Sequence, residues 1–297
     1  MQLADFGRVW VTITVNKGSR GEKMDLARKS FFVMLALAVA LCVGSVAQAQ
    51  DSGFVVENVP NIFGIGAGIA PDYQGSDDST FGALPFGRYT FENTERYVQL
   101  IGAEVYLNVL DHPVYRLGPL LNYRFGRDDD VEDDVVKLIE EIDDTIEGGV
   151  FAGLTFLDPK DSRKRFLTSV ELLTDLGGNH DGSTISFSAR YWHPLSKSVD
   201  ITIGGGFTYA DDDYMSTYFG VSNADSARTG LPVFNAGGGI KSFRIIPGVM
   251  IHLSRSWHVG GGLRYQLLLS DASDSPVTDD RGSDTQIIAT VAVAYSW

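Results

Sequence analysis

The chain has one cysteine, Cys42, and after residue 50 it has no long apolar run. A single thiol excludes an internal disulfide and a cysteine-based metal site. Without a further apolar stretch of about 20 residues, a helical membrane protein is excluded. The five histidines show no HExxH or paired spacing, so neither a metal nor another cofactor is predicted.

Basic residues are also scarce, since 24 Lys and Arg stand against 38 Asp and Glu and give a net charge of −14. Binding to phosphate groups relies on basic patches, so nucleic acid is not expected as a partner. His180, Asp181 and Ser183 lie close together in one polar segment, but a catalytic triad needs convergence in space. Enzyme activity is therefore not predicted.

Residues 24–49 have the organisation of an export signal. A basic start precedes an apolar run over 31–43, and a small-x-small cleavage site follows at 47–49. The run is short for a membrane-spanning helix of about 20 residues. We therefore expect export through the Sec pathway and a mature chain that begins at Gln50.

Residues 1–23 have none of the features of an export signal, and Met24 stands where a signal peptide should start. This first segment is interpreted as an over-extended start, and Cys42 would leave with the signal. Residues 1–49 hold six of the basic and three of the acidic residues, which leaves 18 basic and 35 acidic ones in 50–297.

Residues 50–297 consist of segments of about ten residues in which apolar side chains alternate with small or polar ones, as in β-strands. The predicted strands are 61–70, 81–91, 96–109, 114–126, 148–157, 165–174, 183–193, 199–210, 238–253, 257–270 and 285–297. These are eleven, whereas bacterial barrels normally have an even number. The spacing is regular after residue 110, so the error lies in 50–109. We expect twelve strands, with ten as the alternative.

Two features favour a membrane barrel over a soluble sandwich. Each segment has one apolar face, while the other face holds Arg, Gln, Ser, Thr and Gly, which suits a lipid-facing wall around a polar lumen. The connections also alternate between short ones and long polar ones over 127–147, 175–183, 211–237 and 271–284. The sequence therefore predicts an all-β, transmembrane, antiparallel up-and-down β-barrel whose last strand ends at Trp297.

One helix is predicted over 131–147, because apolar residues recur there at three- and four-residue spacing among acidic ones. It would lie in an extracellular loop, where it packs on the rim or, with the loop 211–237, closes the barrel mouth.

Two groups of charged residues are candidate functional residues. Arg190, Arg244 and Arg264 are expected to face the lumen, where they either line a pore or, as we favour, pair with carboxylates. The acidic loop contains Asp128, Asp129, Asp130, Glu132, Asp133 and Asp134. Its carboxylates either bind divalent cations that bridge lipopolysaccharide phosphates or form a solvated charged loop, which is the favoured interpretation.

Several short motifs also follow one another along residues 50–297. They are 71–78 (PDYQGSDD), 118–119 (GP), 123–127 (YRFGR), 147–149 (EGG), 180–182 (HDG), 214–221 (YMSTYFGV), 268–276 (LLSDASDSP) and the YSW ending. Together they resemble the MipA/OmpV family of outer-membrane proteins, named for an MltA-interacting protein, although Trp297 stands where Phe is commoner. The resemblance implies an outer-membrane barrel without catalytic residues to carry over.

The family's name-giving member implies a scaffold that joins a murein-degrading transglycosylase to a murein synthase, and other members are linked to adhesion, antigenicity or permeability. The first functional hypothesis is thus a non-enzymatic barrel, in contact with outer-membrane lipid and lipopolysaccharide, that is a scaffold for a murein hydrolase/synthase complex. The alternative is a small channel or porin for polar solutes.

Overall fold

The structure is a computed structural model that describes residues 60–297. The expected leader over 1–23 and the expected signal peptide over 24–49 lie outside the described residues. Among residues 60–297, no helix is long and apolar enough to cross a membrane.

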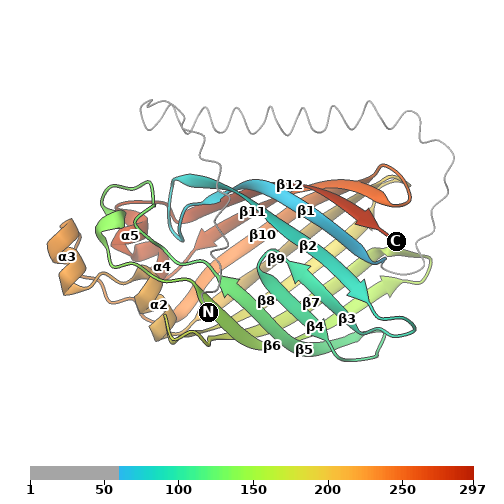
Figure 1. Cartoon of the computed structure of the whole chain (residues 1–297), viewed down its shortest axis with the longest axis horizontal. Coiled ribbons are helices and arrows are strands. Elements are labelled where there is room, and N and C mark those ends of the chain that lie inside the picture. Colours follow the sequence, from blue (N-terminus) through green and yellow to red (C-terminus); the bar gives the residue numbers. More distant parts are fainter. Residues whose placement is uncertain (1–59) are drawn as a thin grey trace, which may run out of the picture. The chain divides into compact units, whose positions relative to one another are not determined.

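Twelve strands form one closed antiparallel barrel, as Figure 1 shows. The strands are β1 (Ile62–Pro71), β2 (Ser79–Thr90), β3 (Tyr97–Ile101), β4 (Glu104–Asn108), β5 (Tyr115–Arg124), β6 (Thr145–Asp158), β7 (Asp161–Asp175), β8 (Ser183–Pro194), β9 (Val199–Ala210), β10 (Gly239–His252), β11 (Trp257–Leu268) and β12 (Thr285–Ser296). Each strand pairs with its neighbours in sequence, and β12 closes the barrel on β1. The predicted fold class and the number of twelve are confirmed.

The error in the predicted strands lies in 96–109, where one predicted strand is the hairpin of β3 and β4. Residues 102–103 form its turn, and Gly102 has a φ of +63°. A two-residue hairpin turn needs such a positive φ at its first position, and glycine adopts it without steric cost. Because the apolar alternation in the sequence continues through this turn, the sequence alone did not reveal the turn.

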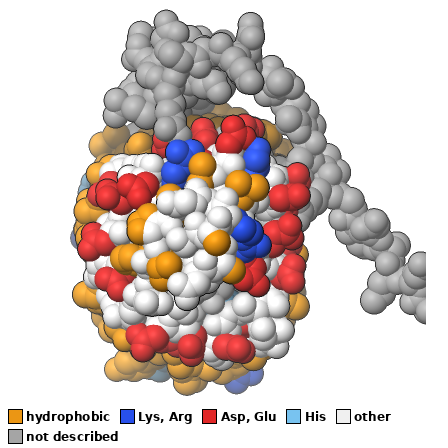
Figure 2. Space-filling model, turned by 90° about the vertical axis from the view of Figure 1, so that its left-hand side faces the viewer, with side chains coloured by type: hydrophobic (Ala, Val, Ile, Leu, Met, Phe, Trp, Pro, Cys, Tyr) orange, Lys and Arg blue, Asp and Glu red, His pale blue; other side chains and the backbone are white. Residues whose placement is uncertain are grey.

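The connections place long loops at one end of the barrel and short turns at the other. The long-loop end has 72–78, 125–144, 176–182, 211–238 and 269–284, together with the tight β3–β4 turn; the short-turn end has 91–96, 109–114, 159–160, 195–198 and 253–256. Figure 2 looks at the long-loop end and shows acidic side chains distributed around its rim. The alternation of short and long connections is as predicted.

The outer wall is apolar throughout. Phe63 and Ile65 of β1 are 56% and 58% exposed, whereas the glycines between and after them face inward. Exposed aromatic side chains form a band near the short-turn end (Phe63, Tyr89, Tyr115, Phe156, Phe166, Trp257, Tyr295) and another near the long-loop end (Phe81, Tyr123, Tyr209, Phe243, Tyr265). An apolar wall between two aromatic bands is the lipid-facing surface of a membrane-spanning barrel.

The helix predicted over 131–147 is wrong. This segment has only one 3₁₀ turn, Val136–Leu138, and β6 already begins at Thr145. Asp133 accepts hydrogen bonds from the amides of Val135 and Val136, and Arg127 pairs with Ile142 by two backbone hydrogen bonds of 2.8 Å. These contacts hold the segment in an irregular path, in which Val136, Ile139 and Ile142 are buried without a continuous helix while Leu138 and Ile146 are exposed.

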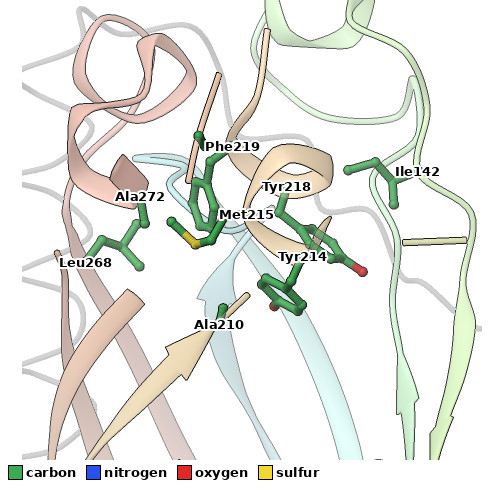
Figure 3. Close-up of a cluster of buried hydrophobic side chains, with 9 residues drawn as sticks. Ile142, Ala210, Tyr214, Met215, Tyr218, Phe219, Leu268 and Ala272 are labelled. Carbon is green, nitrogen blue, oxygen red and sulfur yellow. The ribbon is translucent and has the colours of Figure 1, made fainter. Parts of the chain in front are cut away.

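The helices lie instead in the last two long loops, 211–238 and 269–284. They are α2 (Asp212–Phe219), α3 (Asn223–Thr229), α4 (Asp271–Asp274) and α5 (Pro276–Asp279). Figure 3 shows the side chains of α2 packed between Ala210, Leu268 and Ala272 on one side and Ile142 on the other. Tyr214, Met215 and Phe219 are fully buried there. We call α2, α4, α5 and the loop 125–144 the cap, because they cover the long-loop end.

Candidate functional site

The three predicted arginines lie on the inner face of neighbouring strands. Arg190 of β8 shares a face with Ser186 and Ser188, opposite the exposed Phe187. Arg244 of β10 lies between the exposed Phe243 and Ile245, so it points inward. Arg264 of β11 precedes the exposed Tyr265 and likewise points inward.

Two of these arginines are positioned by the wall of β9. Gly204 is the register partner of Arg190, and a Cβ atom there would lie 3.1 Å from Nε of Arg190, so the side chain crosses bare backbone. Arg244 stands opposite Gly206 and donates a 2.9 Å hydrogen bond from Nη1 to Oγ1 of Thr208. The inner glycines of β9 thus make room for the guanidinium groups.

Two carboxylates interact with the arginines from other strands. Tyr106 of β4 donates a 2.8 Å hydrogen bond to Oε2 of Glu104, and Glu171 of β7 accepts one of 2.9 Å from Ser169. Glu104 interacts electrostatically with Arg264, and Glu171 with Arg244. We call Arg190, Arg244, Arg264, Glu104, Glu171 and Tyr106 the lumen cluster.

The charges of the lumen cluster are near one another but do not touch. Among residues 60–297, no ion pair within 4.0 Å involves Arg190, Arg244 or Arg264. The pairing that the sequence favoured is therefore wrong for these three residues. The three arginines instead interact electrostatically with one another.

Arg264 also shows that the interior is hollow at this level. Its side chain points into the barrel, yet it is exposed to solvent. An inward side chain in a filled barrel would be buried, as in a packed core. Arg264 is thus accessible within the lumen, and Arg190 and Arg244 are partly accessible.

Two more arginines line the lumen toward the short-turn end. Arg88 stacks on the ring of Tyr97 at 3.8 Å, and Arg165 stacks on Trp192 at 4.6 Å. Neither forms an ion pair within 4.0 Å among the described residues. Positively charged side chains therefore extend along the inner wall from the lumen cluster toward the short-turn end.

The cap is attached to the barrel by a buried polar network. Glu147 accepts two hydrogen bonds from Arg124, of 2.6 and 2.8 Å, and its other contacts are His180 at 3.1 Å and Asn122 at 2.6 Å. The ring of Tyr214 on α2 lies 5.1 Å from the Arg124 guanidinium. Arg124 and Glu147 thus join strands β5 and β6 to the helix above them.

Tyr214 also binds the barrel through its hydroxyl group. Lys241 donates hydrogen bonds of 2.9 Å to Tyr214 Oη and to Oε1 of Gln74. Burial alone would raise the pKa of Tyr214, but the cations of Arg124 and Lys241 outweigh burial and lower that pKa. The hydroxyl is thus held in a cationic setting directly above the lumen.

The acidic loop does not come together as one site. Asp133 is buried and pairs with Arg281 at 2.6 Å, while Asp134 pairs with Lys137 on the surface. Asp128 accepts a hydrogen bond from the amide of Asp130. Within 60–297, no group of three or more His, Cys, Asp or Glu side chains is placed to hold a metal ion.

His180, Asp181 and Ser183 do not form a triad. His180 binds Glu147 through Nε2, whereas the Ser183 hydroxyl donates to Thr174 at 3.1 Å. The residues are neighbours in sequence only.

Comparison with known proteins assigns the family. The family described as MltA-interacting protein MipA matches residues 63–297. The chain belongs to the MipA family. The resemblance drawn from the sequence motifs is thereby confirmed.

Solved outer-membrane barrels resemble this MipA-family chain at very low sequence identity. The NanC porin matches with a TM-score of 0.46 and 7% identity, covering 79% of this chain and 100% of the porin. OmpT of Vibrio cholerae matches with a TM-score of 0.38 and 8% identity, covering 82% of this chain and 100% of OmpT. The channel DcaP of Acinetobacter baumannii matches with a TM-score of 0.37 and 10% identity, covering 83% of this chain and 100% of DcaP. No curated protein matches the sequence.

The MipA-family barrel has one polar chain that sequence reading missed. Asp200 contacts His252 at 2.9 Å, the two rings of His252 and His258 meet through their Nδ1 atoms at 2.8 Å, and His258 contacts Ser296 at 2.7 Å. These residues come from β9, β10, β11 and β12. Ser296 is 4% exposed, so the chain fastens four strands at the short-turn end rather than presenting a nucleophile.

Proposed function

We propose that this chain is a non-enzymatic barrel of the outer membrane that admits small anionic solutes to its lumen. One observation carries the proposal. Arg190, Arg244 and Arg264 face the hollow interior without a carboxylate in direct contact. Rings or clusters of basic side chains are the means by which pores select anions.

The charges are large enough to decide which solutes enter. A unit charge about 4 Å from an arginine gains roughly 4 kcal/mol at an effective dielectric constant of about 20. Glu104 and Glu171 offset only part of the positive charge, because the lumen cluster holds three arginines and two carboxylates, and these carboxylates interact only with Arg264 and Arg244. An anion is therefore favoured over a cation, and a solute that carries both signs would be oriented across the lumen.

The environment of the barrel follows from its surface. The apolar wall between the aromatic bands would contact outer-membrane lipid, and the long loops would face outward among lipopolysaccharide molecules. Delivery there would depend on the Sec signal peptide over 24–49. The carboxylates of Asp128, Asp129, Asp130 and Glu132 would lie at the level of lipopolysaccharide phosphates, where divalent cations could join the two.

A scaffold for murein hydrolase and synthase enzymes is the second candidate. The family name supports it, because it describes an MltA-interacting protein. The surface available for such enzymes would be the short-turn end, where Lys160, Lys197 and Arg255 are exposed. Direct binding of purified MltA to the barrel in lipid nanodiscs, and its loss when these three residues are replaced by Gln, would support this role.

Single-channel recording in planar bilayers tests the first proposal against the second. Stable current steps that a small anion such as phosphate blocks would support the solute-admitting barrel. A barrel that stays silent, both as the native chain and with its cap weakened by substitution, would contradict it and leave the scaffold role. Binding of MltA is measured on the same preparation, so the two roles are judged independently.

A further inference from the structure

The barrel wall is incomplete beside β2. Strand β2 pairs with β1 along its whole length, but β3 pairs only with Phe86 to Thr90. The remaining part, from Ser79 to Pro85, therefore has a partner on one side only. In Figure 1 the β3–β4 hairpin stops part-way along the barrel, whereas β2 continues toward the end that carries the cap. We call the missing piece of wall the gap.

The residue at the corner of the gap fits an unpaired edge. The carbonyl of Pro85 accepts the last hydrogen bond across to the hairpin, of 3.0 Å, from the amide of Gly102. Proline has no N–H group to donate, and in sheets it is confined to edges and irregularities. Because backbone groups alternate along a strand, Phe81 and Ala83 direct their N–H and C=O groups toward the gap.

These backbone groups need water. Unpaired strand edges are not tolerated in hydrocarbon, but non-helical backbone is accepted where it lines a water-filled cavity. The edge of β2 thus requires a gap that is continuous with the aqueous lumen rather than one that is sealed by lipid.

Apolar side chains line the inner side of the gap. Leu84 is the register partner of the inward Gly66, and Ile101 is the partner of the inward Phe86, yet Leu84 and Ile101 are 44% and 48% exposed. Glu104, which follows the hairpin turn, interacts electrostatically with Arg264. An apolar border therefore leads directly to the lumen cluster.

Loops that are tied to one another lie at the long-loop end, above the gap. The amide of Glu132 donates a 2.9 Å hydrogen bond to Asp72, which ties the loop 125–144 to the β1–β2 loop. Arg281 and Asp133 join the same loop to 269–284. The cap then covers the long-loop end with the fully buried Phe219 and Tyr214. The loops above the gap and the cap over the mouth are therefore joined to one another.

We infer that the gap is a lateral portal through which an amphipathic anion, with an apolar body and one acidic group, passes between the lipid of the long-loop side and the lumen. Leu84 and Ile101 contact its apolar body, and Arg190, Arg244 and Arg264 bind its acidic group. This inference rests on the proposed function for the binding of the acidic group, and adds to it the route and the apolar body.

Spin labels test the portal. The full chain carries Cys42→Ser, so that each introduced cysteine is the only thiol, and it is placed in lipid nanodiscs. Labels at Leu84→Cys and Ile101→Cys are compared with Ile288→Cys, which faces the lumen on β12 outside the gap, and with Leu121→Cys on the outer wall. Oxygen concentrates in lipid, whereas a nickel chelate stays in water.

The portal requires labels at residues 84 and 101 to collide with both oxygen and the nickel chelate. The label at 288 should meet the nickel chelate and little oxygen, and the label at 121 should show the reverse. A collision pattern at residue 84 equal to that at residue 288 would overturn the portal, because it would mean that lipid does not reach the gap.

Ligand binding provides the second test, with 11-(dansylamino)undecanoic acid as the probe and its methyl ester as the neutral control. The native barrel in nanodiscs should bind the acid saturably above the background of empty nanodiscs. The variant R190Q/R244Q/R264Q should weaken that binding at least about tenfold, equivalent to about 1.4 kcal/mol. The ester should bind alike to both proteins.

Filling the gap separates the portal from the lumen. Leu84→Trp with Ile101→Trp should slow probe uptake at least about tenfold, whereas Ile246→Trp with Ile288→Trp, which adds the same bulk to β10 and β12 outside the gap, should not. Equal uptake rates for these two variants would overturn the portal while leaving an anion-binding lumen intact. An unchanged affinity in the arginine variant would instead overturn the proposed function.

Discussion

A Cβ atom on Gly204 would lie 3.1 Å from Nε of Arg190, so the arginine holds its place in the lumen by crossing a residue without a side chain. The consequence can be tested by Gly204→Ala. Its methyl group should push Arg190 away from the wall and reduce the anion preference of the barrel, with a stability change of only about 0.5–1 kcal/mol. Gly66→Ala is the matched control, because the nearest atom to its new Cβ is 3.6 Å away on the same inner face. Equal effects of both substitutions on ion selectivity would show that Gly204 has no special role.

The cap should restrict movement along the barrel axis. Phe219 of α2 is fully buried in the hydrophobic cluster with Met215, Leu268 and Ala272. Replacing a buried phenylalanine by alanine typically costs about 3–5 kcal/mol of folding free energy. Phe219→Ala should therefore loosen the cap and raise the single-channel conductance. Leu195→Ala, at an exposed position in a short turn, is the control and should leave the conductance unchanged. A conductance that stays at the native level in Phe219→Ala would mean that the cap does not limit the current.

The pair of Asp133 and Arg281 should make the cap sensitive to acid. Burial alone would raise the pKa of Asp133, but the hydrogen bonds from Arg281 and from two backbone amides outweigh it and lower that pKa below 3.8. A carboxyl group with a lowered pKa stabilises the fold above its unfolded value, and this contribution is lost as the pH falls through the folded value. The cap should thus resist proteases near pH 7 and become cleavable below about pH 4.

Asp133→Asn should remove most of this acid dependence and weaken the cap at neutral pH by about 1–3 kcal/mol. Limited proteolysis of loop 125–144 as a function of pH measures both effects. Asp134→Asn removes a surface pair instead and should change little. A native pH profile in Asp133→Asn would exclude the proposed role of this pair.

The chain of polar contacts from Asp200 to Ser296 should stabilise the closure of the barrel. His258→Ala removes the contacts to both His252 and Ser296 and should lower the free energy of unfolding by about 1–3 kcal/mol. Urea unfolding in lipid vesicles measures this change, and His193→Ala, at an exposed position, is the control. If the two variants unfold alike, the contact chain contributes nothing to closure.

The alternation of side chains was sufficient to predict the barrel, because a membrane wall imposes one apolar and one polar face on every strand. It could not resolve residues 96–109, because the apolar alternation in the sequence continues from Ile101 through the turn at Gly102 to Leu107. The predicted helix over 131–147 failed for a different reason. Val136, Ile139 and Ile142 do meet a core, but contacts from Asp133 and Arg127 bend the chain. Helix α2 was missed although Asp211 caps it and acidic residues occupy its first turn, a signal that favours helix starts.

The candidate site was predictable only in part. The inward direction of Arg190, Arg244 and Arg264 follows from strand parity. Their lack of carboxylate partners depends on which strands lie opposite each other, and no local pattern encodes that arrangement. The gap beside β2 depends on the same information, because it arises from the lengths of β3 and β4. Pro85, which has no N–H group to donate, is the local sequence feature that indicates an unpaired edge there.

The most direct test of the account is the zero-current potential in planar bilayers under a potassium chloride gradient. The native barrel should show the sign of an anion-selective pore, and R190Q/R244Q/R264Q should lose or reverse that sign because Glu104 and Glu171 remain. The control K160Q/K197Q/R255Q removes the same charge from exposed turns and should keep the native potential. A native potential in the lumen variant, or an equal shift in the control, would contradict the central role of the three lumen arginines.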